Sequence, residues 1–110
     1  MDITFRTTKL AKQCTGQRTR QKTFGQKQAE KLGRRLDDLR AAKTLDDLRN
    51  APGRCHELTS DRAGQLSIEL EQPYRLIFEP SNEPVPKKDD GGLDWSRITA
   101  VRILEIVDYH

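Results

Sequence analysis

The sequence predicts an α+β fold in which a few helices cover one face of a small, mostly antiparallel sheet. A β-prone run opens the chain, an amphipathic helical pattern occupies residues 24–42, and beyond residue 54 the apolar residues recur at every second position. Helices that precede a run of strands are typical of α+β domains. A chain of 110 residues is the size of one domain, so we expect a single domain over residues 1–110.

The N-terminal part is expected to contain one strand and little other regular structure. Ile3 to Phe5 is a short β-prone run and is predicted to open the sheet. Residues 9–14 have room for one or two helical turns. Residues 15–23 read TGQRTRQKT, which offers almost nothing to bury, and we predict a mobile connector there.

Two helices are predicted next. Thr23 is a suitable N-cap for a main helix from Phe24 to Ala42, and leucines at i, i+4 and i+7 form one apolar stripe along it (Leu32, Leu36 and Leu39). Thr44 is expected to cap a second, short helix, whose first turn is acidic and which ends at Pro52-Gly53.

The rest of the chain is predicted to supply the other strands, over residues 54–59, 65–70, 74–78 and 101–107. In the second of these, Leu66, Ile68 and Leu70 alternate with polar residues and share one face. The near-continuous apolar run at 101–107 is typical of a strand covered on both faces. Residues 80–94, rich in proline, glycine and charge, are predicted to form an exposed and mobile loop.

The net charge of +3 is unevenly distributed along the chain. Residues 1–54 carry 14 basic and 6 acidic side chains, a net charge of +8, whereas residues 55–110 carry 6 and 11, a net charge of −5. Solvated helices would explain such a run of charge, but a basic half also suits a polyanionic partner. We expect nucleic-acid contact, with these candidate RNA-binding residues on the main helix and in the 60–64 turn: Lys27, Lys31, Arg34, Arg35 and Arg62.

Cysteine usage and hydropathy favour a cytoplasmic protein. Cys14 and Cys55 are far apart and form no CxxC motif, so two thiols are a simpler interpretation than one disulfide. No stretch approaches the length of a transmembrane helix, and the first fifteen residues lack the apolar core of a signal peptide. We therefore expect no membrane partner.

The residues best suited to acid–base chemistry are the two histidines and the C-terminal tripeptide. His56 falls in the first strand after the helices, and Asp108-Tyr109-His110 ends the chain after an apolar strand. Histidine titrates near neutral pH, so a pair brought together could act as base and acid. No HExxH or EF-hand pattern and no second cluster of ligands is present, so we expect neither a metal nor another cofactor.

Arg75 lies within the apolar strand YRLIF, where its neighbours face the other way. Its guanidinium could bind a phosphate in bidentate fashion, or it could form an ordinary ion pair with Glu69 or Glu105 on a neighbouring strand. Trp95, the single tryptophan, is predicted to be a packing anchor for the long loop.

These groups together suit metal-free RNA cleavage. A base removes the proton of the 2′-hydroxyl, a cation supports the charge that develops on phosphorus, and an acid protonates the leaving 5′-oxygen. An imidazole or carboxylate, an arginine and a second acid are all available on the predicted strands.

Several of these motifs resemble the HigB branch of the RelE/ParE toxin superfamily, also known as plasmid-maintenance killer proteins. The resemblance extends over most of the chain and is carried by the following residues: Thr44 to Leu48, Pro52-Gly53, His56 and Leu58, Asp61-Arg62 and Gly64, Ser67-Ile68, Tyr74-Arg75-Leu76, and Asp108 to His110. The terminal Asp-Tyr-His is specific in that context, whereas each shorter piece alone is not.

The resemblance implies a compact RNase-like fold with two N-terminal helices against an antiparallel sheet. It also implies a toxin of a type II toxin–antitoxin system, which cleaves mRNA on the ribosome, inhibits translation and is neutralised by a HigA-type helix-turn-helix antitoxin. The state implied is a monomer or a toxin–antitoxin hetero-oligomer. The family's catalytic roles fall on His56, Asp108, Tyr109 and His110, with Arg75 as the phosphate contact.

Three positions depart from the family pattern. Thr59 and Ala63 stand where many relatives have lysine, and Leu66 stands where an aromatic residue often begins the next strand. The site is therefore less cationic. An alternative is a weakened or inactive toxin that only binds its antitoxin and helps to repress the operon. A ParE-like gyrase poison is a third possibility, but such an inhibitor has no need of the acid–base residues at the C-terminus.

Overall fold

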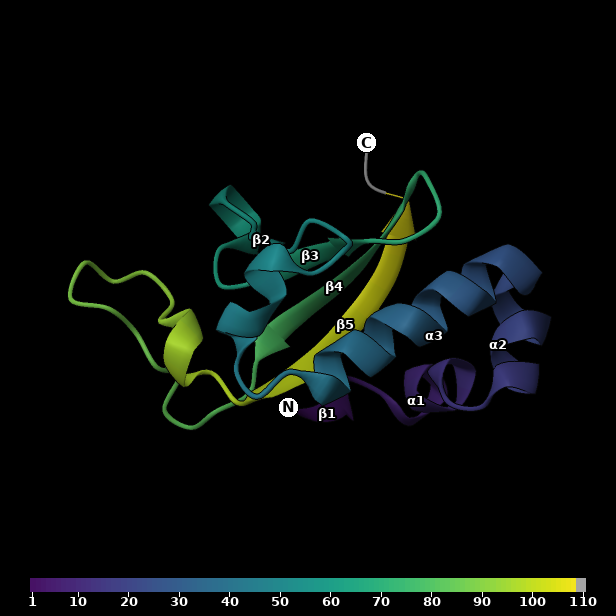
Figure 1. Ribbon diagram of the computed structural model, residues 1–110, viewed down its shortest axis with the longest axis horizontal. Helices are drawn as coiled ribbons and strands as arrows, with labels where there is room; N and C mark the ends of the chain where they lie inside the picture. The colour runs from purple at the N-terminus through teal and green to yellow at the C-terminus, as the bar shows by residue number, and fades with distance from the viewer. Residues whose placement is uncertain (109–110) are drawn as a thin grey trace.

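The computed structural model describes residues 1–108, which form a five-stranded sheet and a layer of helices (Figure 1). The strands are β1 (Asp2–Phe5), β2 (His56–Glu57), β3 (Leu66–Glu69), β4 (Tyr74–Pro80) and β5 (Ala100–Asp108). The α-helices are α1 (Thr8–Cys14), α2 (Gln17–Phe24) and α3 (Gln26–Ala41). Three short 3₁₀ helices complete the order: η1 (Leu45–Asn50), η2 (Ser60–Arg62) and η3 (Trp95–Arg97).

The sheet has the strand order β1-β5-β4-β3-β2. β1 runs parallel to β5, and every other neighbouring pair is antiparallel. The predicted α+β class with a mostly antiparallel sheet is therefore confirmed. Because β4 and β5 are antiparallel neighbours, the start of β4 lies beside the end of β5, and Tyr74 pairs with Asp108.

The main core lies between the sheet and the helices. The predicted stripe of Leu32, Leu36 and Leu39 on α3 is confirmed, because all three side chains are fully buried. They belong to one cluster with apolar side chains of α1, η1 and the strands, among them Phe78 and Ile103. Each such burial stabilises the fold by roughly 1.5–3 kcal/mol. This helix-covered side of the sheet holds nearly all of the apolar burial.

The opposite side of the sheet, called the open face below, carries a second, much smaller cluster of Leu58, Ile77 and Leu104, with Val107 packed against it. No α-helix among residues 1–108 contributes to this cluster. An irregularity at Ile77/Phe78 in the pairing of β4 with β5 leaves Leu104 as an extra residue between Ile103 and Glu105. This bulge lets Leu104 join the open face beside Glu105.

The helix layer differs from the prediction in two respects. Residues 17–24 form α2 instead of a mobile connector, so three α-helices lie between β1 and β2. The main helix begins after Gly25, whose φ is +81°, and not after Thr23. No residue of α2 is fully buried, and Phe24 at its end is the one apolar side chain that packs against the main core, so an apolar stripe could not have revealed the helix.

A polar contact holds α2 in place. The guanidinium of Arg20 donates to the carbonyl oxygen of Cys14 at 2.9 Å, and it lies against Gly33 of α3, where an added Cβ would be only 3.0 Å from Nη2. Glycine at this position leaves room for the arginine to bridge the three helices.

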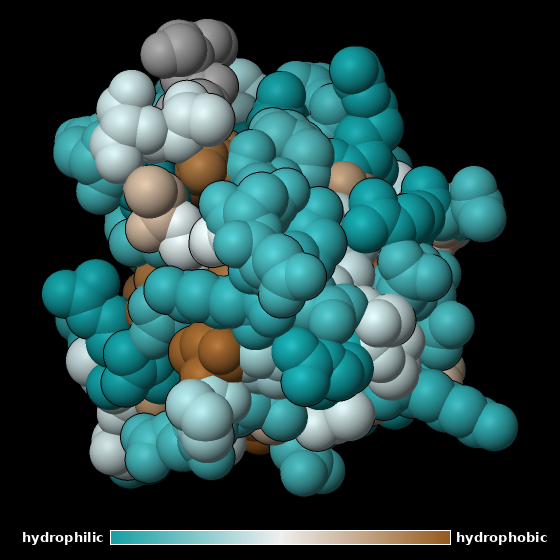
Figure 2. Space-filling model, turned by 90° about the vertical axis from the view of Figure 1, so that its left-hand side faces the viewer, coloured by the Kyte–Doolittle hydropathy of each residue, from teal (hydrophilic) through white to brown (hydrophobic). Residues whose placement is uncertain are grey.

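The long loop before η3 is tied to the body of the protein at several points. The Asn82 side chain accepts hydrogen bonds from the backbone of Thr99 and Ala100, and Leu93 is buried in the main core. Figure 2, which views the end of the molecule that carries this loop, shows a mostly hydrophilic surface with isolated hydrophobic patches. The loop is exposed, as predicted, and it is anchored near its two ends.

Trp95 in η3 is 5% exposed and belongs to the main core, so its predicted role as a packing anchor is confirmed. Within residues 1–108, no helix is both long enough and apolar enough to cross a membrane.

Candidate functional site

His56 and Arg75 lie on the open face of the sheet. His56 pairs with Ser67 on β3, and Ser67 pairs with Ile77 on β4, a member of the open-face cluster. Arg75 is two residues from Ile77 on the same strand and therefore points to the same side. Two strand spacings and two residues along the strand separate His56 from Arg75, which corresponds to roughly 12 Å between Cα atoms. Both side chains can therefore reach one nucleotide.

The ring of His56 has a defined hydrogen bond. Its Nδ1 lies 2.8 Å from the carbonyl oxygen of Arg54, and a carbonyl oxygen can only accept. Nδ1 therefore carries the proton, and in the neutral ring Nε2 keeps its lone pair. Arg54 is in the left-handed region, with φ at +51°, which costs energy for a residue with a side chain. The backbone is thus bent where it meets the His56 ring.

Arg75 makes one of the two ion pairs considered from the sequence. Its Nη2 lies 3.9 Å from Oε1 of Glu69 on β3, and Nη1 donates to Gln72 at 3.3 Å. The same Glu69 carboxylate is 3.6 Å from Arg54. The Arg75 side chain is 19% exposed, so part of it remains accessible.

Glu105, the other predicted partner of Arg75, pairs with Arg62 instead. Arg62 extends from η2 to the carboxylate of Glu105 on β5 at 3.3 Å, and it also donates to Gln65 at 2.9 Å. The cations of the open face, Arg54, Arg62 and Arg75, thus share two carboxylates. The charge available to an incoming phosphate is smaller than the number of arginines indicates.

Asp108 ends the described chain at the edge of this face. It is exposed and pairs with Tyr74, next to the pair formed by Arg75 and Val107. Val107 packs on the open face and Ile106 on the helix side, so alternation places Asp108 on the helix side of the strand end. Tyr109 and His110 lie outside the described residues.

The candidate RNA-binding residues on α3 do not share the open face. Lys31 pairs with Glu71 at 3.6 Å, and Lys27 and Arg34 lie around the same shallow cleft, which also contains Glu30. Arg35, which we predicted to be an RNA-binding residue, is only 9% exposed and pairs with Asp38 at 3.3 Å. Its stem packs beside Gly53, so its side chain offers little surface to RNA, contrary to that prediction.

Sequence reasoning missed a larger group of cations on α1 and α2. From Ile3 to Ala29 the chain contains seven basic residues and no acidic one. Lys9, Lys12, Arg18 and Lys22 are exposed, and no ion pair involves any of them within residues 1–108. We call these four residues the α1–α2 basic surface. Its signal was the positive charge of the N-terminal half, which suggested a polyanionic partner, but the candidate residues were placed on the main helix and residues 15–23 were interpreted as a connector.

The two cysteines are free thiols, as predicted. Burial raises the pKa of the Cys14 thiol to about 11 and that of the Cys55 thiol to about 12. Both are protonated at neutral pH, so neither is suited to act as a nucleophile.

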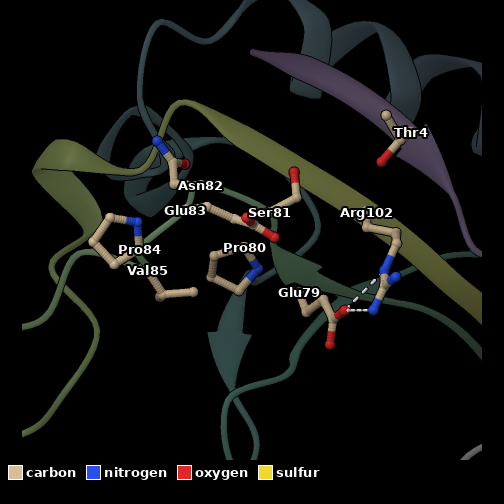
Figure 3. Close-up of a pocket in the computed structure, with 9 residues that line it drawn as sticks. All are labelled: Thr4, Glu79, Pro80, Ser81, Asn82, Glu83, Pro84, Val85 and Arg102. Atoms are coloured by element: carbon tan, nitrogen blue, oxygen red, sulfur yellow. Dashed lines mark hydrogen bonds and ion pairs between the residues drawn. The ribbon is translucent and has the colours of Figure 1, made fainter.

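Other parts of the described surface offer less to a reaction. A cavity of about 800 Å³ lies at the opposite end of the sheet from Arg75, where Arg102 pairs with Glu79 and the 81–85 segment forms one wall (Figure 3). It contains none of the predicted site residues. Among residues 1–108, no group of three or more His, Cys, Asp or Glu is placed to hold a metal ion.

A family profile now identifies the group to which the protein belongs. Residues 4–88 match the HigB-like toxin family, described as RelE-like toxins of the type II toxin–antitoxin system HigB. The chain belongs to this family. The match covers most of the chain, including β2, the η2 turn and β4, so the resemblance deduced from the sequence motifs is confirmed.

Solved structures show the same fold. A YoeB/ParE toxin from Agrobacterium tumefaciens superposes with a TM-score of 0.62 at 10% identity, over 100% of both chains. The toxin fold in a YoeB–YefM complex and in a YoeB dimer, both from Staphylococcus aureus, gives TM-scores of 0.57 and 0.54 at 15% and 17% identity, over 100% of this chain and 97% of those. Among curated proteins, none matches this HigB-like chain in sequence.

Proposed function

We propose that this HigB-like toxin is a metal-independent endoribonuclease that cleaves mRNA on the ribosome and thereby inhibits translation. One observation carries the proposal. His56, with Nε2 free to accept a proton, and Arg75 lie on the same helix-free face of the sheet, beside the strand end that leads into Asp108-Tyr109-His110.

The chemistry follows from these groups. A base takes the proton of the 2′-hydroxyl, and the 2′-oxygen attacks the adjacent phosphorus. The bond from phosphorus to the 5′-oxygen breaks, and an acid protonates that oxygen. The products are a 2′,3′-cyclic phosphate and a 5′-hydroxyl, so neither water nor a metal ion is consumed. His56, Asp108, Tyr109 and His110 supply the acid–base groups, and Arg75 supports the charge on the phosphorane.

The ribosome supplies the second contact. Unpaired cations attract RNA phosphates more strongly than cations that already have a carboxylate partner, because no ion pair has to be given up. The α1–α2 basic surface meets this condition, and Lys27, Lys31 and Arg34 add contacts on α3. Arg62, which lies on the open face, adds a contact beside the cleavage site. We assign docking on ribosomal RNA to the helix side and cleavage to the open face.

The partner that restrains the toxin is, in this proposal, a HigA-type helix-turn-helix antitoxin. The family is defined by membership of a toxin–antitoxin system, and a toxin of the same fold is known in a complex with YefM. The assembly is then a toxin–antitoxin hetero-oligomer, which dissociates to release the active toxin.

A second candidate is a weakened toxin that mainly binds its antitoxin and helps to repress the operon. The observation in its favour is that the open-face arginines are engaged by Glu69 and Glu105, while Thr59 and Ala63 add no lysine. Leu66, the third departure, is fully buried in the core and affects packing instead of the charge of the site.

Pulse expression in growing cells tests the proposal. The wild-type chain should arrest growth and create new mRNA 5′ ends, and His110→Ala and Asp108→Ala should relieve both effects while the purified variants keep the melting temperature. Undiminished toxicity in both variants would contradict the proposal. If gyrase–DNA complexes are trapped and translation is unaffected, the chain is a ParE-like poison. If the wild-type chain never arrests growth, it is the weakened toxin.

A further inference from the structure

We propose that Glu57 is a positioning residue: its carboxylate binds the buried indole of Trp95, which holds strand β2 in place and so fixes the His56 ring. This inference rests on the role of His56 in the proposed function, but it makes a structural claim that can be tested separately.

Strand β2 is weakly held by the sheet. It consists of His56 and Glu57, lies at the edge of the sheet, and pairs with β3 on one side only. The next residue, Leu58, donates its N–H to the carbonyl oxygen of Gln65 and packs its side chain on the open face. The backbone on each side of it is strained, because Arg54 and Ser60 both have positive φ, at +51° and +58°. Leu58 holds this short edge segment from the open face, and a tether on the helix side is needed to fix its orientation.

Trp95 provides that tether. Its Nε1 donates to Oε2 of Glu57 at 3.0 Å, and its ring is 5% exposed within the main core. An indole N–H can only donate, and a buried donor requires an acceptor, so the bond to Glu57 satisfies Trp95 as well. The guanidinium of Arg49, from η1, lies over the ring at 4.2 Å from its centre. In Figure 1, η3 is the yellow-green helical turn at the end of the long loop.

The tether acts on His56 through the alternation of the strand. Consecutive side chains of a strand point to opposite faces, so a Glu57 held toward Trp95 directs His56 to the open face. In that orientation Nδ1 of His56 meets the carbonyl oxygen of Arg54 at 2.8 Å, which leaves Nε2 as the basic atom. If β2 rotated, this bond would break and the preference for one tautomer would be lost.

Four variants separate positioning from other roles of the carboxylate. Glu57→Gln keeps an oxygen that accepts from the indole, whereas Glu57→Leu keeps the size and removes the acceptor. Trp95→Phe keeps the ring in the core and removes the donor. Glu83→Leu is the matched control, because Glu83 is exposed and makes no hydrogen bond or ion pair with another part of residues 1–108.

Two measurements follow these variants in the full-length chain. Ring ¹⁵N shifts give the tautomer of His56, in a spectrum with only one other histidine. Cleavage of mRNA on programmed ribosomes gives kcat and KM. We expect Glu57→Leu and Trp95→Phe to lose the preference for the Nδ1–H tautomer and about tenfold in kcat with unchanged KM, as a small displacement of a catalytic group does. Glu57→Gln and Glu83→Leu should behave as wild type.

Two results would overturn the inference. One is an unchanged His56 tautomer in both Glu57→Leu and Trp95→Phe. The other is a loss of kcat in Glu57→Gln as large as that in Glu57→Leu, because the charge of the carboxylate would then be needed and not only its acceptor oxygen. If the wild-type chain cleaves no mRNA but its His56 tautomer responds as described, the proposed function fails and the positioning role stands.

Discussion

The helix layer and the open face of the sheet both carry several basic side chains, but they use them differently. On α1 and α2, four exposed cations have no carboxylate partner in the described structure. On the open face, Arg54, Arg62 and Arg75 share Glu69 and Glu105. Unpaired, like-charged helices suit the binding of a long polyanion, whereas arginines held by carboxylates beside a histidine suit the positioning of one phosphate. In the proposed function, RNA binding and RNA cleavage are therefore assigned to separate surfaces.

Substitutions on the open face should have the largest effect, and that effect should fall on cleavage and not on ribosome binding. His56→Ala and Arg75→Ala should each lower mRNA cleavage on ribosomes by about 10²-fold or more, because each removes an acid–base group or the phosphate contact. Ribosome binding, measured by co-sedimentation, should change little. A loss of binding as large as the loss of cleavage would contradict the division of roles.

The reciprocal change removes charge from the helix layer. Replacing Lys9, Lys12, Arg18 and Lys22 by glutamine should weaken ribosome binding and reduce the slope of log affinity against log salt by about 3. The cleavage rate at saturating ribosomes should be retained. The matched control replaces Lys43, Lys87, Lys88 and Arg40, which removes the same charge elsewhere. Equal losses in the two quadruple variants would show that only net charge matters.

Removing the carboxylate that pairs with Arg75 should increase the positive charge of the open face. In Glu69→Gln, Arg75 and Arg54 lose their shared carboxylate, and the open face gains one positive charge. Partly exposed ion pairs of this kind contribute up to about 1 kcal/mol, so we expect cleavage to rise by at most about fivefold. Single-turnover rates would measure the change. A fall in rate would mean that Glu69 orients Arg75 and does not restrain it.

Both thiols, Cys14 of α1 and Cys55 before β2, pack against the main core on the helix side, and they should show the smallest effect. Burial raises the folded-state pKa of Cys14 and Cys55 to about 11 and about 12, so both are protonated at pH 8 and should react slowly with iodoacetamide unless urea is present. Above pH 9 the unfolded chain ionises its thiols while the folded chain keeps them protonated, so stability should fall as the pH rises toward 11–12. Urea midpoints at pH 7, 9 and 10.5 would test this, with the Cys14→Ala/Cys55→Ala variant as the control. Fast alkylation of the folded chain at pH 8 would contradict it.

Much of the fold could be predicted from the sequence, because it depends on apolar periodicity. The α3 stripe and the alternation of Leu66, Ile68 and Leu70 are local patterns that burial imposes, and all of these residues are buried. Helix α2 could not be predicted in this way. It buries no residue of its own and is held by the contact of Arg20 with the Cys14 carbonyl and with Gly33, which only the tertiary structure brings together.

The residues of the site could be predicted from their chemistry, but the ion pairs that they form could not. His56 and Arg75 were candidates because of their chemistry, and the structure places them on one face. Which carboxylate each arginine meets depends on strand register and on the β-bulge, and these assign Glu105 to Arg62 and Glu69 to Arg75. The burial of Arg35 beside Gly53 likewise arises from the packing of α3 on a distant segment.

The central claim is metal-free transesterification of mRNA on the open face, and the chemistry of the cut ends tests it most directly. Purified wild-type chain should cleave mRNA on programmed ribosomes to give a 2′,3′-cyclic phosphate and a 5′-hydroxyl, and the His110→Ala variant should form neither. Ends that carry a 3′-hydroxyl and a 5′-phosphate would contradict the account, because they require an attacking water in place of the 2′-oxygen.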